Sequence, residues 1–349
     1  MALKPPVEVP QGAIRLNTDS QKLEFFAQDQ WWEMATDVPT LDGGARGVFG
    51  GGGKDPSAGN PSTNVIDYIT IPTAGNATDF GDLTESKLRS AAAGSRVRGY
   101  FMGGGNHPTN NRLNTIEYIT FSSTGNGTDF GDLDTTTTDD KSRMGGCNSA
   151  TRGLCAGGLS GNSNKMWYIT MTTSGTGLDF GDLNANLEQP MACSSPTRAL
   201  WAGGNDGGST HVNTIQYITT ASLGNAQDFG DVTIGESLRG YAAFSNSTRG
   251  VYGGGIRHPS GVQAGIEYIT MATKGNALDF GDLNYSNRQE GGGASSSTRG
   301  LFMGGYSPAT TNVIDYVQIS TTGDATDFGN LFAARMQIAG FSNGHGGLG

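Results

Sequence analysis

Short stretches in which apolar and polar residues alternate run along most of the chain, and glycine, asparagine, serine and proline separate them. In residues 239–283, four such stretches cover 239–245, 249–254, 265–271 and 277–283. They are rich in Ile, Val, Tyr, Thr and Phe, which suit a pleated sheet, and the breaks carry residues that suit turns. No segment keeps a helical period. The pattern predicts an all-β protein of short strands.

This four-stranded pattern repeats along the chain. Its most regular marker is the tripeptide Asp-Phe-Gly, which recurs about every 50 residues, as repeat architectures require. The copies begin at Asp79, Asp129, Asp179, Asp228, Asp279 and Asp327. Four-stranded units with this period are typical of β-propeller blades, which bury their two apolar faces against neighbouring blades. The spacing predicts six blades.

The two ends of the repeat region favour a closed ring. The first copy starts at Arg46 with its second strand and lacks a first strand. Near the C-terminus, residues 339–343 (AGFSN) parallel residues 242–246 (AAFSN), which form a first strand in the fifth copy. We therefore expect the C-terminal strand to pair into the first blade and close the propeller.

The repeat resembles the kelch family in three markers: a double glycine ending the second strand, a tyrosine on the third, and an arginine opening the first strand at Arg89, Arg143 and Arg239. The resemblance implies the fold of the galactose-oxidase central domain. One departure is that this chain has Phe80 and its equivalents where kelch repeats carry tryptophan. The segments RGVFGGG (46–52), NVIDYIT (64–70) and GNATDFGDL (75–83) also resemble repeat proteins of marine bacteriophages, over about residues 45–349.

Residues 1–44 do not repeat and form a separate predicted domain beside the propeller of residues 45–349. Alternating stretches at 13–17, 22–27 and 31–34 predict a small β-meander. The segment 12–34 is similar to short modules near the ends of phage fibre and virion proteins. Such a small unit cannot bury all its large side chains, so they must be covered by another virion protein or by the chain's own propeller. The predicted docking residues are Phe25, Phe26, Trp31 and Trp32.

Composition excludes several partners. The formal net charge is -10 and Lys and Arg do not cluster, so we expect no nucleic-acid partner. No stretch of about 18 apolar residues exists, so we expect no membrane insertion. Three cysteines are too few and odd in number for a disulfide framework, which favours synthesis in a reducing cytoplasm.

The motifs that resemble catalytic chemistry have structural explanations. Asp-Phe-Gly occurs six times without the companion motifs of a kinase, so Phe is expected to pack between blades. One hypothesis pairs Asp79 or Asp82 with Arg46. The four histidines show no close metal-ligand spacing, and no catalytic set can be singled out. We therefore predict no metal, no cofactor and no enzymatic activity.

Comparison of the copies predicts where a partner binds. Turns between strands one and two, and between strands three and four, are alike, whereas the loops after the double glycine and the links between blades differ. Alternate turns lie on the same face, so one face is uniform and the other variable, and variable loops on a rigid scaffold are where recognition occurs. The candidate binding residues are Lys54, Asp55, His107, Arg112, Asp206, His211, Arg257, His258, Tyr285 and Tyr306.

The leading hypothesis is a phage virion surface protein (a fibre, spike or vertex component) that is assembled in the cytoplasm of the bacterial host. Residues 1–44 would bind other virion proteins, and the variable face would bind a glycan or protein of the host surface. A homo-oligomer is compatible with this hypothesis. Two alternatives are a capsid or tail decoration protein without a receptor role, and a carbohydrate-active enzyme with two carboxylates at the channel mouth.

Overall fold

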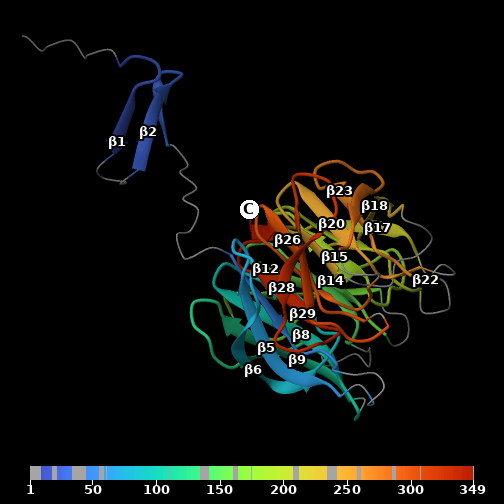
Figure 1. The fold of residues 1–349 in the computed structure, drawn as a ribbon. Coiled ribbons are helices and arrows are strands. Elements are labelled where there is room, and N and C mark those ends of the chain that lie inside the picture. The colour runs from blue at the N-terminus through green and yellow to red at the C-terminus, as the bar shows by residue number, and fades with distance from the viewer. Residues whose placement is uncertain are drawn as a thin grey trace, which may run out of the picture. The chain divides into compact units, whose positions relative to one another are not determined.

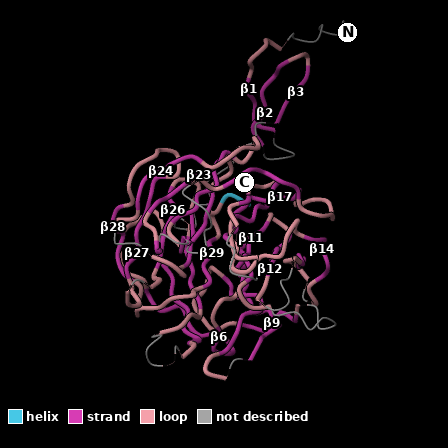
Figure 2. The backbone as a smooth tube through the Cα atoms, turned by 90° about the vertical axis from the view of Figure 1, so that its right-hand side faces the viewer, coloured by secondary structure: helices cyan, strands magenta, loops and turns pink. Residues whose placement is uncertain are grey.

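The computed structural model describes residues 9–17, 22–33, 45–54, 59, 61–109, 111–133, 141–159, 164–173, 175–206, 212–233, 242–257, 261–284, 288–306 and 308–348. The chain divides into two compact units, Met1–Gly43 and Gly44–Gly349. Strands make up nearly all of the regular structure, and the described part contains one short 3-10 turn, η1 (Gly346–Leu348), drawn in cyan in Figure 2. No helix in the described ranges is long and apolar enough to cross a membrane.

The smaller unit is the expected β-meander. Its strands are β1 (Ile14–Asn17), β2 (Lys22–Ala27) and β3 (Gln30–Glu33). They pair in the order β1-β2-β3, all antiparallel, with Ile14 opposite Phe25 and Phe25 opposite Trp32. These bounds match the three alternating stretches of the sequence to within one residue at most positions.

The larger unit contains six four-stranded antiparallel sheets, one for each copy of the repeat (Figure 1). Sheets one to three are β29-β4-β5-β6, β7-β8-β9-β10 and β11-β12-β13-β14, with strands β29 (Ala339–Ser342), β4 (Arg46–Gly50), β5 (Thr63–Thr70), β6 (Thr78–Lys87), β7 (Ala91–Gly94), β8 (Arg98–Asn106), β9 (Asn111–Thr120), β10 (Thr128–Asp132), β11 (Met144–Asn148), β12 (Arg152–Gly157), β13 (Lys165–Thr170) and β14 (Leu178–Asp182).

Sheets four to six follow the same order along the chain. They are β15-β16-β17-β18, β19-β20-β23-β24 and β25-β26-β27-β28, with strands β15 (Met191–Ser194), β16 (Arg198–Ala202), β17 (Thr214–Thr219), β18 (Gln227–Asp231), β19 (Ala242–Ser245), β20 (Arg249–Gly253), β23 (Gly265–Thr270), β24 (Leu278–Asp282), β25 (Gly292–Ser295), β26 (Arg299–Met303), β27 (Val313–Gln318) and β28 (Thr326–Asn330). A small hairpin, β21 (Ile256–Arg257) with β22 (Gly261–Val262), lies in a loop of sheet five and was not expected.

Sheet one takes its first strand from the other end of the chain. Strand β29 pairs with β4, and Ala339 lies opposite Gly50 and Phe341 opposite Val48. This is the pairing that the sequence parallel predicted for residues 339–343. Sheet one therefore combines strands from the beginning and the end of the repeat region.

The first strands of the six sheets contact one another in sequence. They run β7, β11, β15, β19, β25 and β29, and β29 also contacts β7. These strands carry small residues because their backbones approach closely. A Cβ on Gly293, for example, would lie 2.4 Å from the carbonyl oxygen of Ala243 in the next sheet, which is too close for any side chain. The space that these six strands enclose is called the central channel below.

The hydrophobic core lies between neighbouring sheets. Phe80 is buried and its ring meets the ring of Tyr68 edge-on at 5.8 Å, and the other Asp-Phe-Gly phenylalanines do the same in their own sheets. The carbonyl of Phe80 accepts a hydrogen bond of 2.8 Å from the amide of Gly125 in sheet two. The amide of Gly75 in sheet one donates likewise to Phe328 of sheet six. The tripeptide is a packing and sheet-joining element, as expected.

The proposed ion pair between Arg46 and Asp79 or Asp82 is wrong. The Arg46 guanidinium lies over the ring of Tyr68, 5.0 Å from its centroid, and donates to the carbonyl of Phe121 in sheet two at 2.6 Å. Both aspartates are exposed. A half-buried guanidinium gains more from an aromatic face and a carbonyl than from a solvated carboxylate.

Candidate functional site

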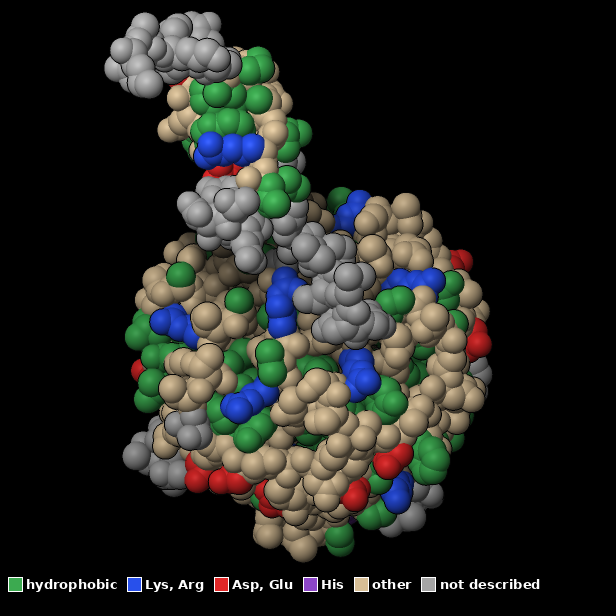
Figure 3. All heavy atoms as spheres, turned by 90° about the vertical axis from the view of Figure 1, so that its left-hand side faces the viewer, with side chains coloured by type: hydrophobic (Ala, Val, Ile, Leu, Met, Phe, Trp, Pro, Cys, Tyr) green, Lys and Arg blue, Asp and Glu red, His purple; other side chains and the backbone are tan. Residues whose placement is uncertain are grey.

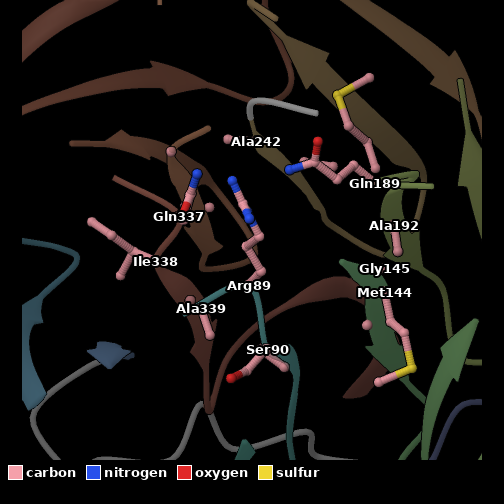
Figure 4. Close-up of a pocket in the computed structure, with 18 of the residues that line it drawn as sticks. Arg89, Ser90, Met144, Gly145, Gln189, Ala192, Ala242, Gln337, Ile338 and Ala339 are labelled. Atoms are coloured by element: carbon pink, nitrogen blue, oxygen red, sulfur yellow. The ribbon is translucent and has the colours of Figure 1, made fainter. Parts of the chain in front are cut away.

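A polar cavity of about 130 Å³ lies at one end of the central channel. Its walls come from the residues that open the first strands, so segments far apart in the sequence contribute to one space. Figure 4 shows Arg89, Gln189 and Gln337 extending toward this space. For comparison, a cavity of about 150 Å³ inside a protein holds a benzene molecule. The polar cavity therefore has room for about one six-membered ring.

Five polar residues that line this cavity share an unusual backbone conformation. Each stands shortly before its sheet's first strand and has φ between 56° and 63°, the left-handed region: Arg89, Arg143, Gln189, Glu290 and Gln337. The equivalent residue of sheet five, Gly240, lies outside the described residues. A left-handed backbone costs a residue with a side chain about 1–2 kcal/mol. We call these five residues the polar ring.

Backbone hydrogen bonds hold the polar ring together. The amide of Arg89 donates to the carbonyl of Gln337 at 3.0 Å, and the amide of Arg143 donates to the carbonyl of Arg89 at 3.0 Å. Gln189 continues the chain by donating to Arg143 at 2.9 Å, and Gln337 donates to the carbonyl of Glu290. Each sheet thus fixes the left-handed residue of the next, which explains why the strained conformation persists.

The side chains of the polar ring also interact. The amide of Gln337 donates to Glu290 Oε2 at 2.8 Å, and the Arg89 guanidinium lies 3.8 Å from Glu290 Oε1. Arg143 forms an ion pair with Glu188. The side chains of Arg89, Glu290 and Arg143 retain exposed fractions of 22%, 14% and 15%. The site therefore presents guanidinium, amide and carboxylate groups, which can bind hydroxyl, amide or carboxylate groups of a ligand.

Buried cations stand two residues before three members of the polar ring. Arg335 pairs with Asp67, Arg288 with Asp315, and Lys87 with Glu117 at 2.6 Å, and each acid lies on strand three of a sheet. Burial raises the pKa of Asp67, although Arg335 opposes that shift, and burial lowers the pKa of Arg335.

Sheets three and four carry other residues at these two positions. Where strand three of sheet three carries Trp167 instead of an acid, the ammonium of Lys141 lies 5.5 Å from the ring centroid. Where sheet four has the neutral Gln216, the position two before Gln189 is Leu187. In four sheets a cation of the segment that carries the polar ring therefore contacts strand three, on an acid in three of them and on an aromatic ring in the fourth.

Three of the residues predicted to bind a ligand lie in loops that contact a loop of a neighbouring sheet: Lys54, His107 and Tyr306. The carbonyl of Lys54 accepts a hydrogen bond of 2.9 Å from Thr310 Oγ1, and Thr310 also bridges to Tyr306. The carbonyl of His107 accepts one of 3.0 Å from the amide of Ser62 in sheet one. These contacts join the loops of neighbouring sheets.

The remaining predicted residues are separate from these loops or lie outside the description. Arg112 is exposed on β9 and Asp206 is half-buried. The described ones among the ten do not line the polar cavity. The side chain of Arg257 and four whole residues lie outside the described part of the chain: Asp55, His211, His258 and Tyr285.

Sequence reasoning missed the polar ring. It recorded Arg89 and Arg143 only as markers of the repeat. The available signal was that the same repeat position is polar in five of the six copies yet changes from arginine to Gln189, Glu290 and Gln337. A position that is usually polar and varies its chemistry is expected to face solvent or a ligand, and the five described residues at this position line one cavity.

The four predicted docking residues divide between the two faces of the meander. Phe25 and Trp32 are exposed by 37% and 43%, on the face that also carries three exposed aliphatic residues: Ile14, Leu16 and Leu23. On the other face Phe26 packs edge-on against Trp31 with ring centroids 5.3 Å apart, and Arg15 covers Trp31. Figure 3 shows hydrophobic side chains gathered on this unit. We call the five exposed residues the apolar face.

The face of the larger unit drawn in Figure 3 carries Lys and Arg side chains singly, without a basic patch. Among the described residues, no three His, Cys, Asp or Glu side chains gather as a metal site would require.

Comparison with known proteins gives a likeness of fold. No family model matches the chain, and no curated protein matches it. Among solved structures, the one titled "Structure of YjhT" superposes with a TM-score of 0.57 and 10% identity, covering 72% of this chain and 88% of that chain. At this identity the likeness concerns the fold alone. Together with the six four-stranded sheets, it is compatible with a β-propeller-like architecture.

Proposed function

We propose that the six sheets are the blades of one closed, kelch-like β-propeller. Support comes from the contacts between sheets six and one, which repeat those between the other neighbours. Leu301 and Phe328 of sheet six share a core cluster with Phe49 of sheet one. Arg299 of sheet six donates to the carbonyl of Pro72 at 2.6 Å, as Arg46 does toward sheet two.

The propeller acts as a binding module and carries no enzymatic activity of its own. The observation that carries this proposal is the convergence of five polar, left-handed residues on one cavity. Backbone strain of this kind is retained mainly where a site depends on it. Glu290 is the only carboxylate among the described residues that line the cavity, whereas glycoside hydrolysis ordinarily uses two.

The ligand is a polar group of a bacterial cell surface, either a glycan or a protein segment. Guanidinium and amide side chains bind hydroxyl and carboxylate groups in pairs, and the surrounding loops differ between sheets as recognition loops do. The assignment to a phage virion rests on the resemblance of the repeats to marine bacteriophage proteins. In this proposal the protein is a fibre, spike or vertex component of the particle.

The apolar face of the meander attaches the protein to another virion protein. Its five exposed apolar residues form a contiguous surface across three strands, which water solvates poorly. The double substitution Phe25→Ser with Trp32→Ser removes much of that surface and changes no residue of the propeller.

The test compares three full-length proteins for binding to host cells and to isolated capsid and tail proteins: the unmodified chain, the meander variant above, and a ring variant, Arg89→Ala with Gln337→Ala. We expect the ring variant to lose cell binding only and the meander variant to lose virion-protein binding only. Lys274→Ala, on the turn between strands three and four, serves as the control. If the unmodified chain binds only virion proteins, it is a decoration or assembly protein and the receptor role is wrong.

A further inference from the structure

The other end of the central channel is filled by residues 344–348. Gly346, Gly347 and Leu348 are buried, and η1 contacts β11, β15 and β19. The fit leaves no room for side chains at the two glycines. A Cβ on Gly346 would lie 2.1 Å from the carbonyl oxygen of Asn246, and one on Gly347 would lie 2.2 Å from that of Asn148. We call residues 344–348 the plug.

Serine and asparagine side chains join the first strands at this end. Ser245 Oγ donates to the carbonyl of Ser194 at 2.6 Å, and Ser295 Oγ donates to that of Ser245 at 2.8 Å. Asn148 donates to the carbonyl of Gly94 at 2.9 Å. Gly94 is the position in sheet two where the repeat has no hydroxyl or amide of its own.

His345 holds the plug against this position of sheet two. Its Nε2 lies 2.7 Å from the carbonyl oxygen of Gly94, and the amide of Gly347 donates to its Nδ1 at 3.0 Å. Because Nδ1 accepts a hydrogen bond from an N–H group, the ring must be neutral with its proton on Nε2. Both hydrogen bonds are satisfied only in this form.

We propose that the plug is a proton-operated closure: protonation of His345 at Nδ1 places two N–H groups opposite each other and releases residues 344–348 from the channel. The lost hydrogen bond is the one inside the plug, between His345 and Gly347. Release would open a cavity of about 40 Å³ that is lined by Cys147 and Cys193, among others.

The charged surroundings act in the same direction. Arg96, in the turn after β7, donates to the carbonyl of Leu348 at 3.4 Å and disfavours a second positive charge nearby. Strands β11 and β15 contribute Cys147 and Cys193, whose thiols stay neutral because burial raises their pKa, that of Cys193 to about 12. Strands β19, β25 and β29 contribute no titratable side chain.

The direction of the pH effect follows from the histidine. Burial, with Arg96 nearby, lowers the pKa of His345 from 6.5 to about 4. A group whose pKa is lower in the closed state stabilises closure above its free pKa and loses that contribution as the pH falls toward the lower value. With these two pKa values, the open fraction of the plug rises about 30-fold between pH 7.5 and pH 5.

The test follows the amides of the plug. Hydrogen exchange of residues 346–348 is measured at pH 7.5 and pH 5, and each rate is divided by the rate of the same amide in the unfolded chain at the same pH. We expect this ratio to rise about 30-fold from pH 7.5 to pH 5. The amide of Leu154, which is fully buried in the core between sheets three and four, is the internal control and should keep the same ratio at both pH values.

Two variants sharpen the test. His345→Ala should speed the exchange of residues 346–348 at both pH values, and His107→Gln, in a loop at the other end, should leave the exchange profile of the unmodified chain unchanged. The proposal is overturned if protection is the same at both pH values. It is also overturned if the amide of Leu154 exchanges as fast as those of residues 346–348, because that result means general unfolding.

Discussion

The first strands of the six sheets begin and end in different chemistry. At their beginning stand the charged and amide side chains of the polar ring, in a left-handed backbone, around an open cavity. At their end stand serine and asparagine residues that join one strand to the next, with the plug filling the space between them. One end keeps strain and exposed polar groups, and the other satisfies its polar groups internally. This difference is what separates a site for a ligand from a structural seal.

The largest expected effect concerns the buried ion pairs beneath the polar ring. Arg335→Leu leaves the Asp67 carboxylate buried without its cation, which should cost about 3–5 kcal/mol of unfolding free energy at neutral pH. Because burial raises the pKa of Asp67, the deficit should shrink in acid, where that carboxyl takes up a proton in the folded state. Urea denaturation at pH 7 and pH 4 measures both values.

The chain supplies the matched control for that experiment. Asp67→Gln combined with Arg335→Leu reproduces the Gln216 and Leu187 pair of sheet four. The double variant should recover most of the lost stability. If it is as unstable as Arg335→Leu alone, the pairing is not what anchors this segment.

An intermediate effect is expected at the sealed end. Gly347→Ala places a Cβ against the carbonyl of Asn148 and should displace the plug, with a loss of about 1–3 kcal/mol. Hydrogen exchange of the amides of residues 346–348 should accelerate. Gly105→Ala is the control, since its Cβ would meet nothing closer than 3.6 Å and should be tolerated. Unchanged exchange in Gly347→Ala would contradict the tight fit of the plug.

The smallest effect tests the strain at the open end. Gln189 has φ 56°, and Gln189→Gly should stabilise the fold by up to about 1 kcal/mol, because glycine adopts that conformation without cost. The same change should weaken ligand binding, because it removes a side chain from the cavity. Thermal unfolding and cell binding, measured on one preparation, separate the two effects. A variant that loses stability would show that the side chain serves packing.

The sequence by itself determined the periodic features of this protein. The all-β class, the strands of each copy, the pairing of residues 339–343 with the first copy and the three-stranded meander all follow from alternation, turn residues and repetition. Most of these signals lie within one copy of about 50 residues, so local preference is enough to define them, and the pairing of residues 339–343 follows from comparing one copy with another. The packing role of Phe80 and its equivalents was predictable for the same reason.

Only the tertiary structure decided which residues meet. Arg89 and Gln337 are neighbours because equivalent positions of a ring converge at its axis, although nearly the whole repeat region separates them in sequence. The Arg46 guanidinium packs on Tyr68 and donates to a carbonyl of the next sheet, and it does not pair with Asp79. The first two partners lie where neighbouring sheets pack together, whereas Asp79 is exposed to solvent. His345 bonds to the carbonyl of Gly94, although 251 residues separate the two in the sequence. Such contacts depend on distances between sheets, which no local pattern encodes.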